Sequence, residues 1–165
     1  MTTELPTDWA AAMPDVLARL EGIRHPRVAA VGCGRGCSAL AIAATFLDAH
    51  VDGLDPGAAS IAAARVRAAD AGLDGRVRFI RGDAAQLRAH GPYDLVLLLD
   101  GLSELADPVG ALRAARAALA AGGTVLVLGE LVAGTVRDLA AAAGYARAGA
   151  LALDDDVARL YRLVP

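Results

Sequence analysis

The sequence predicts an α/β fold in which helices cover both faces of a seven-stranded, mostly parallel sheet. From residue 27 onward, short apolar runs alternate with Ala-rich stretches, which is typical of βα units. Pairs such as Gly91-Pro92, Asp107-Pro108 and Gly122-Gly123 mark the boundaries between these runs. A chain of 165 residues is long enough for one such domain with a substantial core.

The expected elements follow one another along the chain. A first helix runs from Thr7-Asp8 to about Leu20, with Pro14 either kinking it or marking its true start. The predicted strands lie at 27–31, 49–54, 76–81, 93–99 and 123–129. The predicted helices lie at 37–47, 57–71, 108–120 and 134–143. We therefore expect an N-terminal helical segment over residues 1–25, a candidate lid, followed by the α/β domain over residues 26–165.

The end of the chain breaks this alternation. Tyr145–Leu153 and Val157–Val164 are two extended runs separated only by Asp154-Asp155-Asp156. A terminal antiparallel hairpin fits this pattern, because turns favour Asp for its local hydrogen bonds. We interpret the acidic triplet as a solvated turn and assign it no cation. The hairpin brings the predicted sheet to seven strands.

Composition narrows the possible functions. The formal charge is −3 and the basic residues are spread along the chain, so we expect no nucleic-acid partner. No apolar run approaches the roughly 20 residues of a membrane span, and residues 1–8 lack the pattern of a secretion signal. The sequence thus predicts a cytoplasmic protein without a membrane partner. All 16 basic residues are Arg, which removes lysine chemistry, and a small-molecule substrate is favoured.

The cysteines and histidines indicate no metal site. Cys33 and Cys37 are the only cysteines, and no histidine lies near them to complete a set of zinc ligands. We interpret both as small packed thiols beside a loop. His25, His50 and His90 stand at the starts of predicted strands or in connecting loops, and we treat them as structural.

Glycines and carboxylates gather at the predicted strand ends, where parallel sheets bind ligands. The first strand is followed by Gly32-Cys33-Gly34-Arg35-Gly36, whose glycines permit a tight turn and close approach of the backbone to a ligand. Asp55 ends the second strand 19 residues after Gly36, where a carboxylate can accept both hydroxyls of a ribose. The combination predicts a nucleoside pocket.

Two more carboxylates follow the next two strands. Asp83 is placed to accept from an adenine amino group, and Asp100 points to the reactive end of a cofactor. A nicotinamide dehydrogenase also combines glycines with a carboxylate at about this distance. We rank that alternative lower, because the third small residue of its pattern would fall at Cys37.

These ordered motifs resemble those of class I S-adenosylmethionine-dependent methyltransferases. The resemblance covers about residues 27–165 and rests on VGCGRGCSALAIA, GLDPGAASIAAARVRAADAGLDGRVRF, GDAAQL and YDLVLLLDGLSELADPVGALRAARAALAAGGTVLV. The chain is most similar to the catalytic domain of bacterial methyltransferases that carry an N-terminal winged-helix domain. The resemblance implies a Rossmann-like sheet and S-adenosylmethionine as the cofactor.

The resemblance also implies roles for individual residues. The loop Gly32–Gly36 would pass the methionine end of the cofactor, Asp55 would hold the ribose, and Asp83 with Ala84 would contact adenine. Leu102 would lie near the methyl acceptor. The implied cofactor-binding set is Val31, Gly32, Cys33, Gly34, Gly36, Asp55, Pro56, Asp83, Ala84, Asp100 and Leu102.

Two departures from the family pattern bear on catalysis. Ala30 stands where relatives carry an acidic residue that helps to anchor the methionine ammonium. A histidine often found after the fourth strand is absent from Leu102–Leu105, which leaves Asp100, Ser103 and Glu104 as candidate catalytic residues. If Glu104 faces a closed pocket, burial would raise its pKa toward a range useful for a general base.

The connection after the fifth strand is also short. Gly129–Gly134 stands where relatives insert helices that cover the acceptor. An uncovered pocket would expose apolar surface, so we predict that a homodimer or a partner protein completes it. Methyl transfer to a small-molecule nucleophile is the leading hypothesis. Two alternatives stay open: a non-methylating step, such as a cyclisation in natural-product biosynthesis, and a non-catalytic partner subunit of a methyltransferase.

Overall fold

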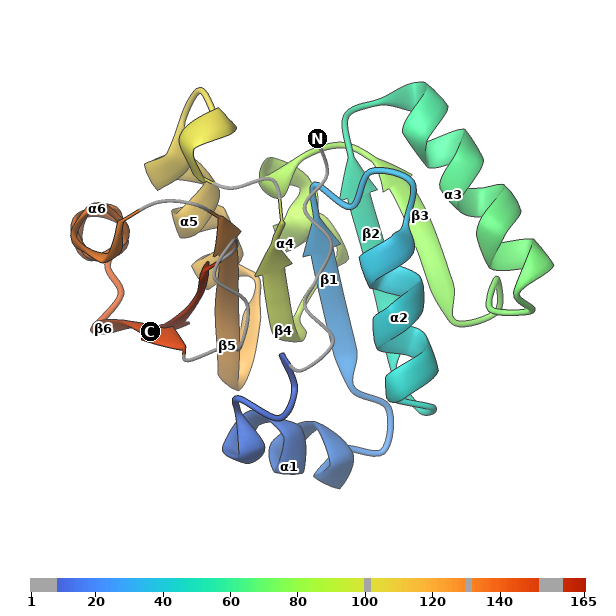
Figure 1. The fold of residues 1–165 in the computed structure, drawn as a ribbon, viewed down its shortest axis with the longest axis horizontal. Coiled ribbons are helices and arrows are strands. Elements are labelled where there is room, and N and C mark those ends of the chain that lie inside the picture. Colours follow the sequence, from blue (N-terminus) through green and yellow to red (C-terminus); the bar gives the residue numbers. More distant parts are fainter. Residues whose placement is uncertain (1–8, 100–101, 130–131, 152–158) are drawn as a thin grey trace.

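A seven-stranded sheet forms the centre of the molecule (Figure 1). The computed structural model describes residues 9–99, 102–129, 132–151 and 159–165. The strands are β1 (Arg27–Val31), β2 (His50–Asp55), β3 (Val77–Arg81), β4 (Tyr93–Leu98), β5 (Leu119–Gly129), β6 (Arg147–Leu151) and β7 (Arg159–Val164), in the order β3-β2-β1-β4-β5-β7-β6. The first five strands pair in parallel, and β7 lies antiparallel to both β5 and β6. The predicted fold class, including the antiparallel pairing of the C-terminal strands, is confirmed; the turn predicted at Asp154-Asp155-Asp156 lies outside the described residues.

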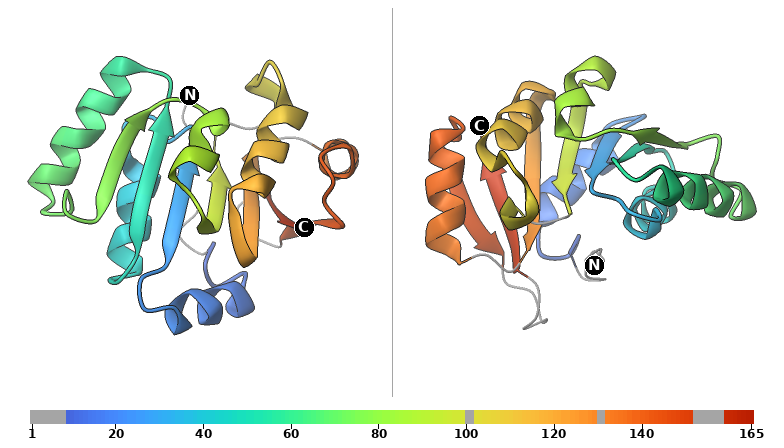
Figure 2. Two further views of the ribbon diagram at one scale, coloured as in Figure 1. Left: turned by 180° about the vertical axis from the view of Figure 1, so that it is seen from behind. Right: turned by 90° about the horizontal axis from the view of Figure 1, so that it is seen from above.

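Helices cover both faces of this sheet. They are α1 (Pro14–Gly22), α2 (Cys37–Thr45), α3 (Ala58–Asp70), α4 (Leu87–His90), α5 (Pro108–Ala117) and α6 (Ala133–Ala142), with short 3₁₀ turns η1 (Ala84–Gln86) and η2 (Leu102–Glu104). The apolar residues of α1 to α3 pack in one buried cluster and those of α4 to α6 in another. Seen from behind, α4 and α5 lie in front of the sheet (Figure 2).

The apolar runs of the strands supply both clusters. Successive side chains of a strand point to opposite faces, so a strand covered on both sides reads as a continuous apolar run. In β4, Leu95 and Leu97 belong to the cluster beneath α1 to α3, whereas Val96 and Leu98 belong to the cluster beneath α4 to α6. This explains why the strands of this sequence show runs and not alternation.

The first helix begins at Pro14, so this proline marks the true start and does not kink the helix. Trp9 and Met13 are buried in the core, which ties the segment down before the helix starts. Arg19 donates a hydrogen bond to Asp94 at the beginning of β4. The helix therefore lies at the end of the sheet where the parallel strands start (Figure 1). The first eight residues of the candidate lid fall outside the described residues.

The predicted end of the helix before the fifth strand and the predicted start of that strand are both wrong. The sequence predicts a helix to residue 120 and a strand from residue 123, but α5 ends at Ala117 and Leu119 already pairs with Tyr93. Helix propensity of the Ala-rich segment is a weak preference that this pairing overrides. Gly122, with φ of 75°, lies within the register shift between the Tyr93–Leu119 pair and the Leu95–Thr124 pair. The sequence also does not predict the short elements η1, α4 and η2.

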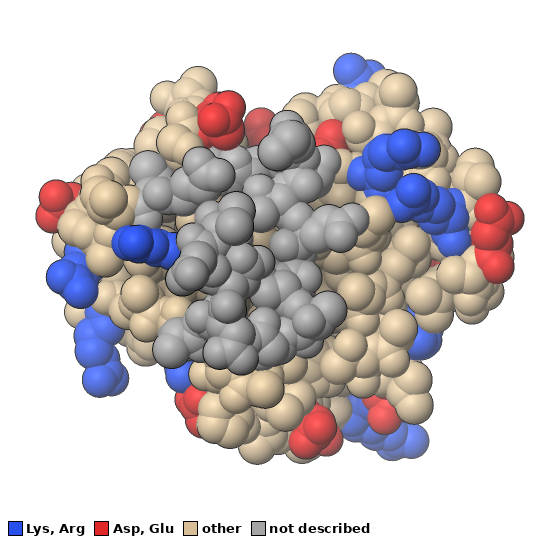
Figure 3. Space-filling model, in the orientation of Figure 1, with Lys and Arg blue, Asp and Glu red and all other residues tan. Residues whose placement is uncertain are grey.

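The surface carries both signs of charge. On the face shown in Figure 3, acidic and basic side chains are interspersed, and the largest basic group lies over the region of α3. Within the described ranges, no helix is long and apolar enough to span a membrane.

Candidate functional site

The loop after β1 has a tightly turned backbone. The N–H groups of Gly32 and Cys33 both donate to the Leu54 carbonyl oxygen of β2, at 2.8 and 3.1 Å. Gly32, Gly34 and Gly36 have φ values of 72°, 51° and 87°. Residues with a Cβ rarely adopt this left-handed region, so the loop requires glycine at these points. The predicted tight turn at the carboxyl end of β1 is present.

Asp55 connects this loop to the start of α3. Its Oδ2 accepts a hydrogen bond from the Gly34 N–H at 2.9 Å, and its Oδ1 accepts one from the Gly57 N–H at 2.8 Å. The residue is only 8% exposed. Each carboxylate oxygen has room for a second donor, so Asp55 can hold the loop and still accept from a ligand. The sequence predicts that Asp55 accepts from a ligand, but it does not predict that Asp55 holds the loop.

Phe79 of β3 supports the loop from the core. A Cβ added at Gly36 would lie 2.6 Å from the ring Cζ, and one added at Gly53 would lie 2.6 Å from Cδ1 and Cε1. Cys33 is 2% exposed, and its Sγ would lie 3.0 Å from a Cβ added at Gly53. Cys33 is thus a packed thiol, as interpreted. The role of Gly53 is not predicted, although a glycine inside a strand run is a known sign of close approach.

A cavity of about 450 Å³ lies between this loop and the start of α5. Part of its lining comes from the predicted cofactor-binding set, namely Val31, Gly32, Pro56, Asp83 and Ala84. The rest comes from Ala85 and from the segment that leads into α5, namely Leu105, Ala106, Asp107, Gly110 and Ala111. Most of the lining residues have small, apolar side chains, and the carboxylates are those of Asp83 and Asp107. Such a lining suits a flat, partly apolar ligand with a few polar groups.

Asp83 also stabilises the backbone of η1. Its Oδ1 accepts from the Ala85 N–H at 2.8 Å, while Gln86 Oε1 accepts from the Asp83 N–H at 2.7 Å. This reciprocal arrangement is a capping box. The Asp83 side chain is exposed in the lining of the cavity, and a carboxylate has about four acceptor sites, more than the cap uses. A ligand donor can therefore reach it without breaking the cap.

The wall formed by the start of α5 is not predicted. Asp107 is the N-cap of α5, and its Oδ1 accepts from the Gly110 N–H at 2.8 Å. A Cβ at Gly110 would collide with the Asp107 carboxylate, so the cap needs glycine there. The sequence contained a signal, because Asp followed by Pro108 is typical of an N-cap and first helical position. The sequence alone identifies this pair as a boundary and not as part of a pocket wall.

The candidate catalytic residues do not meet in the described structure. Ser103 and Glu104 are exposed on η2 and make no hydrogen bond or ion pair with another described residue. Leu102 is 1% exposed and packs in the cluster that contains α5. Asp100 lies outside the described residues. Neither Ser103 nor Glu104 lines the cavity between the glycine loop and α5.

The other titratable residues singled out lie away from this cavity. The rings of His25 and His50 contact each other edge-on, with centroids 5.9 Å apart, where β2 begins. Cys37 is half-buried, and its Sγ accepts from Arg67 Nη1 at 2.7 Å. Among the described residues, no group of three or more His, Cys, Asp or Glu side chains is arranged to hold a metal ion.

Comparison with known sequences identifies a family. A model of the methyltransferase domain matches residues 28–123. The ubiquinone biosynthesis O-methyltransferase of Stutzerimonas stutzeri (strain A1501) is 32% identical over 99 residues, which are 60% of this chain and 42% of that protein. The chain spans less than half the length of this curated relative.

Solved structures share the fold. An O-methyltransferase from neocarzinostatin biosynthesis, in complex with S-adenosylmethionine and 2-hydroxy-5-methyl naphthoic acid, has a TM-score of 0.72 at 22% identity, covering 88% of this chain and 50% of that chain. Precorrin 8w decarboxylase of Methanobacterium thermoautotrophicum has a TM-score of 0.69 at 19% identity, covering 99% of this chain and 94% of that chain. At these identities the likeness establishes the architecture.

Proposed function

Because the chain belongs to the methyltransferase domain family, we propose that it binds S-adenosylmethionine and transfers the methyl group to a small-molecule nucleophile. Family membership implies this cofactor, which supplies an electrophilic methyl group on a sulfonium. The observation that carries the proposal is the cavity of about 450 Å³ beside a glycine loop whose shape is held by the Asp55 carboxylate.

The residues present fit the adenosine half of this cofactor. Asp55 keeps acceptor capacity on both oxygens, which suits the two hydroxyls of a ribose. The exposed carboxylate of Asp83 suits the amino group of adenine, and Ala84 with Leu105 offers apolar contact to a flat ring. A volume of about 450 Å³ falls within the roughly 300–1,000 Å³ of small-molecule sites.

Catalysis by this chain would depend mainly on positioning. Methyl transfer needs the nucleophile held about 3–3.5 Å from the methyl carbon and in line with the breaking bond. Asp100, Ser103 and Glu104 remain our candidates for handling the acceptor proton, yet the described pair is solvent-exposed. An acceptor that is already partly ionised suits such a site. Two of the similar proteins are named as O-methyltransferases, which favours a hydroxyl acceptor, and one of these two was solved with a hydroxy-naphthoic acid.

Calorimetric titration with S-adenosylmethionine and S-adenosylhomocysteine tests cofactor binding. Asp55→Asn should weaken both affinities by about tenfold to a hundredfold, since hydrogen bonds to a charged group contribute about 1.5–3 kcal/mol. Asp70→Asn, the same charge change on an exposed residue at the end of α3, should leave them unchanged. The absence of heat with either ligand would refute the proposal. Cofactor binding without formation of S-adenosylhomocysteine over a panel of phenols, thiols and amines would refute methyl transfer but not cofactor binding.

A non-methylating reaction is the second candidate. Ala30 is fully buried in the apolar cluster, so this position offers no carboxylate to a methionine ammonium. The fold is shared along nearly the whole length of a protein named as a decarboxylase. Product formation that persists after the cofactor has been stripped would favour this candidate over methyl transfer.

We also propose that a second copy of this chain or a partner protein completes the site. Val132, which immediately precedes α6 on the side where β5 ends, is 63% exposed. Sedimentation velocity over a range of concentrations would test self-association, and a clean monomer would contradict it. Activity that arises only on mixing with a full-length methyltransferase would instead identify a non-catalytic subunit.

A further inference from the structure

A second cavity, of about 650 Å³, lies at the opposite end of the sheet. It is formed around the first residues of β1, β2 and β3 and the adjoining part of α3, and it shares no lining residue with the cavity at the carboxyl ends. Its charged lining consists of Arg27, Asp52, Arg65, Asp74, Arg76 and Arg78. Guanidinium groups outnumber carboxylates by two in this cavity, although the whole chain has a formal charge of −3.

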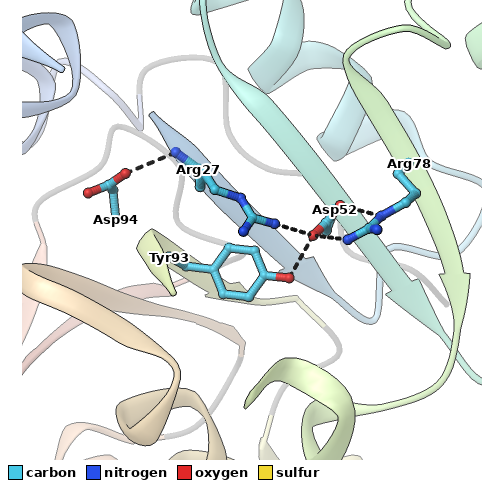
Figure 4. Close-up of polar contacts among 5 residues, drawn as sticks. All are labelled: Arg27, Asp52, Arg78, Tyr93 and Asp94. Atoms are coloured by element: carbon cyan, nitrogen blue, oxygen red, sulfur yellow. Dashed lines mark hydrogen bonds and ion pairs between the residues drawn. The ribbon is translucent and has the colours of Figure 1, made fainter. Parts of the chain in front are cut away.

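The Asp52 carboxylate accepts hydrogen bonds from two of these guanidiniums (Figure 4). Asp52 accepts from Arg27 Nη2 at 3.1 Å and from Arg78 Nε and Nη2 at 2.9 and 2.8 Å. The Tyr93 hydroxyl donates to the same carboxylate at 2.7 Å. The Asp52 side chain is 9% exposed, whereas those of Arg27 and Arg78 are 37% and 56% exposed. One positive charge of this group is therefore uncompensated and open to solvent.

The other two guanidiniums are fixed by neutral groups. Arg65 donates through Nε and Nη2 to the Phe79 carbonyl oxygen at the free edge of β3, at 3.3 and 2.8 Å. Arg76 donates to three carbonyl oxygens around the end of α2. Neither forms an ion pair with a carboxylate of the described residues. Their positions are thus set in advance, while their charges are not neutralised.

We propose that this cavity binds a small dianionic oxyanion, of the phosphate monoester or dicarboxylate class. The excess of two positive charges matches a dianion. A guanidinium has five N–H donors in a planar fork that fits phosphate and carboxylate oxygens, and each of the four arginines keeps donors that the described residues do not use. Guanidiniums already held by backbone and carboxylate lose little freedom when a ligand binds. The site is independent of the proposed cofactor pocket.

Calorimetric titration with inorganic phosphate and with succinate, at low ionic strength and mildly alkaline pH, tests the proposal. We expect saturable binding of one ion per chain that weakens as salt is added. Prior saturation with S-adenosylhomocysteine should not change it. Binding of phosphate alone would assign the phosphate ester class, binding of succinate alone would assign the dicarboxylate class, and binding of both would support their shared chemistry.

Two variants change the charge of the cavity without removing an arginine. Gly75 lines the cavity, and nothing lies within 4 Å of an added Cβ, so Gly75→Glu places a carboxylate among the guanidiniums. It should weaken binding by about tenfold, the effect of one charge at short range in a partly solvated site. Asp74→Asn removes an exposed carboxylate and should strengthen binding a few-fold. A purely structural role for the arginines predicts neither change.

Gly149→Glu is the matched control. It adds the same charge on β6, the strand at the other edge of the sheet, where an added Cβ also has open space. It should leave the affinity unchanged. Equal weakening by Gly75→Glu and Gly149→Glu, displacement by S-adenosylhomocysteine, or no saturable binding of either ion would overturn the proposal.

Discussion

Asp52 and Asp55 lie three residues apart in β2, are nearly equally buried, and have quite different partners. Asp52, toward the start of the strand, accepts from two guanidiniums and a phenol that reach it from β1, β3 and β4. Asp55, at the end of the strand, accepts from two backbone N–H groups. Two similarly buried carboxylates of one strand therefore have charged side-chain donors at one end of the sheet and backbone donors at the other.

The difference lies in what remains available to a ligand. Guanidiniums neutralise a carboxylate and use its lone pairs, so Asp52 holds four hydrogen bonds and little capacity for more. Backbone N–H groups orient a carboxylate without removing its charge, so Asp55 can still accept from hydroxyl donors. A carboxylate held by arginines is suited to joining strands, whereas one held by amides is suited to binding.

Replacing each carboxylate by alanine gives the largest expected effects. Asp52→Ala leaves two guanidiniums and a buried phenol without their acceptor, and it should lower the free energy of unfolding by about 3 kcal/mol. Affinity for S-adenosylhomocysteine should stay near the wild-type value. Asp55→Ala should lower that affinity by at least about tenfold and lower stability by only about 1–2 kcal/mol. Urea unfolding and calorimetry measure the two quantities, and equal stability losses would contradict the comparison.

The next largest effect concerns the packing under the glycine loop. Gly53→Ala would place a Cβ 2.6 Å from two ring carbons of Phe79, and it should lower the free energy of unfolding by about 2 kcal/mol, as overpacking does. Phe79→Leu should recover part of the loss, which a double-mutant cycle in urea would detect. Gly149→Ala, in open space on β6, is the control and should be nearly neutral. No coupling with Phe79 would show that the ring is not the obstacle.

The sequence predicts the carboxyl end of the sheet far better than the amino end. The glycine loop and Asp55 follow apolar runs at short, regular distances, so local patterns suffice to find them. The Asp52 cluster depends on strand register, because Asp52 is the direct partner of Arg78 on β3, while Tyr93 comes from beyond β1. A lone Asp inside an apolar strand hints at such a partner without identifying it.

Dependence on tertiary contacts also limits prediction of the cavity at the carboxyl ends of the strands. The family resemblance indicates Pro56, Asp83 and Ala84, which all line it. The wall that contains Asp107 comes from the packing of α5 against η1, a tertiary contact without a local pattern. The prediction of Ser103 and Glu104 as catalytic residues rests on their position along the chain, which does not determine whether a loop side chain faces a pocket or solvent.

Tyr93 makes the amino end sensitive to alkali. Burial first, and then its hydrogen bond to Asp52, raise the pKa of this phenol well above its usual value near 10. The unfolded chain therefore ionises first, so stability is fully present below pH of about 10 and falls as the pH rises above it. Tyr93→Phe should flatten this decline and lower stability at neutral pH by about 1 kcal/mol.

Denaturant unfolding across this pH range measures both effects. Tyr145 is the matched control, because burial also raises its pKa, but its hydroxyl donates to the Leu112 carbonyl oxygen and not to a carboxylate. Tyr145→Phe should flatten the alkaline decline while leaving the Asp52 cluster intact. An unchanged slope in Tyr93→Phe would show that the phenol is not the titrating group.

The smallest effect is expected at an exposed ion pair beside the same end of the sheet. Asp15, in the first turn of α1, lies 2.7 Å from Arg162 Nη2 of β7, and their side chains are 63% and 29% exposed. The hydrogen bond from Arg162 lowers the pKa of Asp15, so its contribution is present above the ordinary pKa of Asp and is lost as the pH falls through the lowered value. Asp15→Asn should lower the free energy of unfolding by less than about 0.5 kcal/mol, because water screens the pair.

Added salt separates this pair from the Asp52 cluster. The effect of Asp15→Asn should vanish at about 1 M salt, where the screening length is only about 3 Å, whereas the effect of Asp52→Ala should persist. Both aspartates bind arginine, but Asp52 is buried and accepts from two arginines and a tyrosine, whereas Asp15 is exposed and pairs with one arginine. A loss in Asp15→Asn as large as that in Asp52→Ala, or one that resists salt, would mean that pairing with arginine decides the energy of these carboxylates and burial does not.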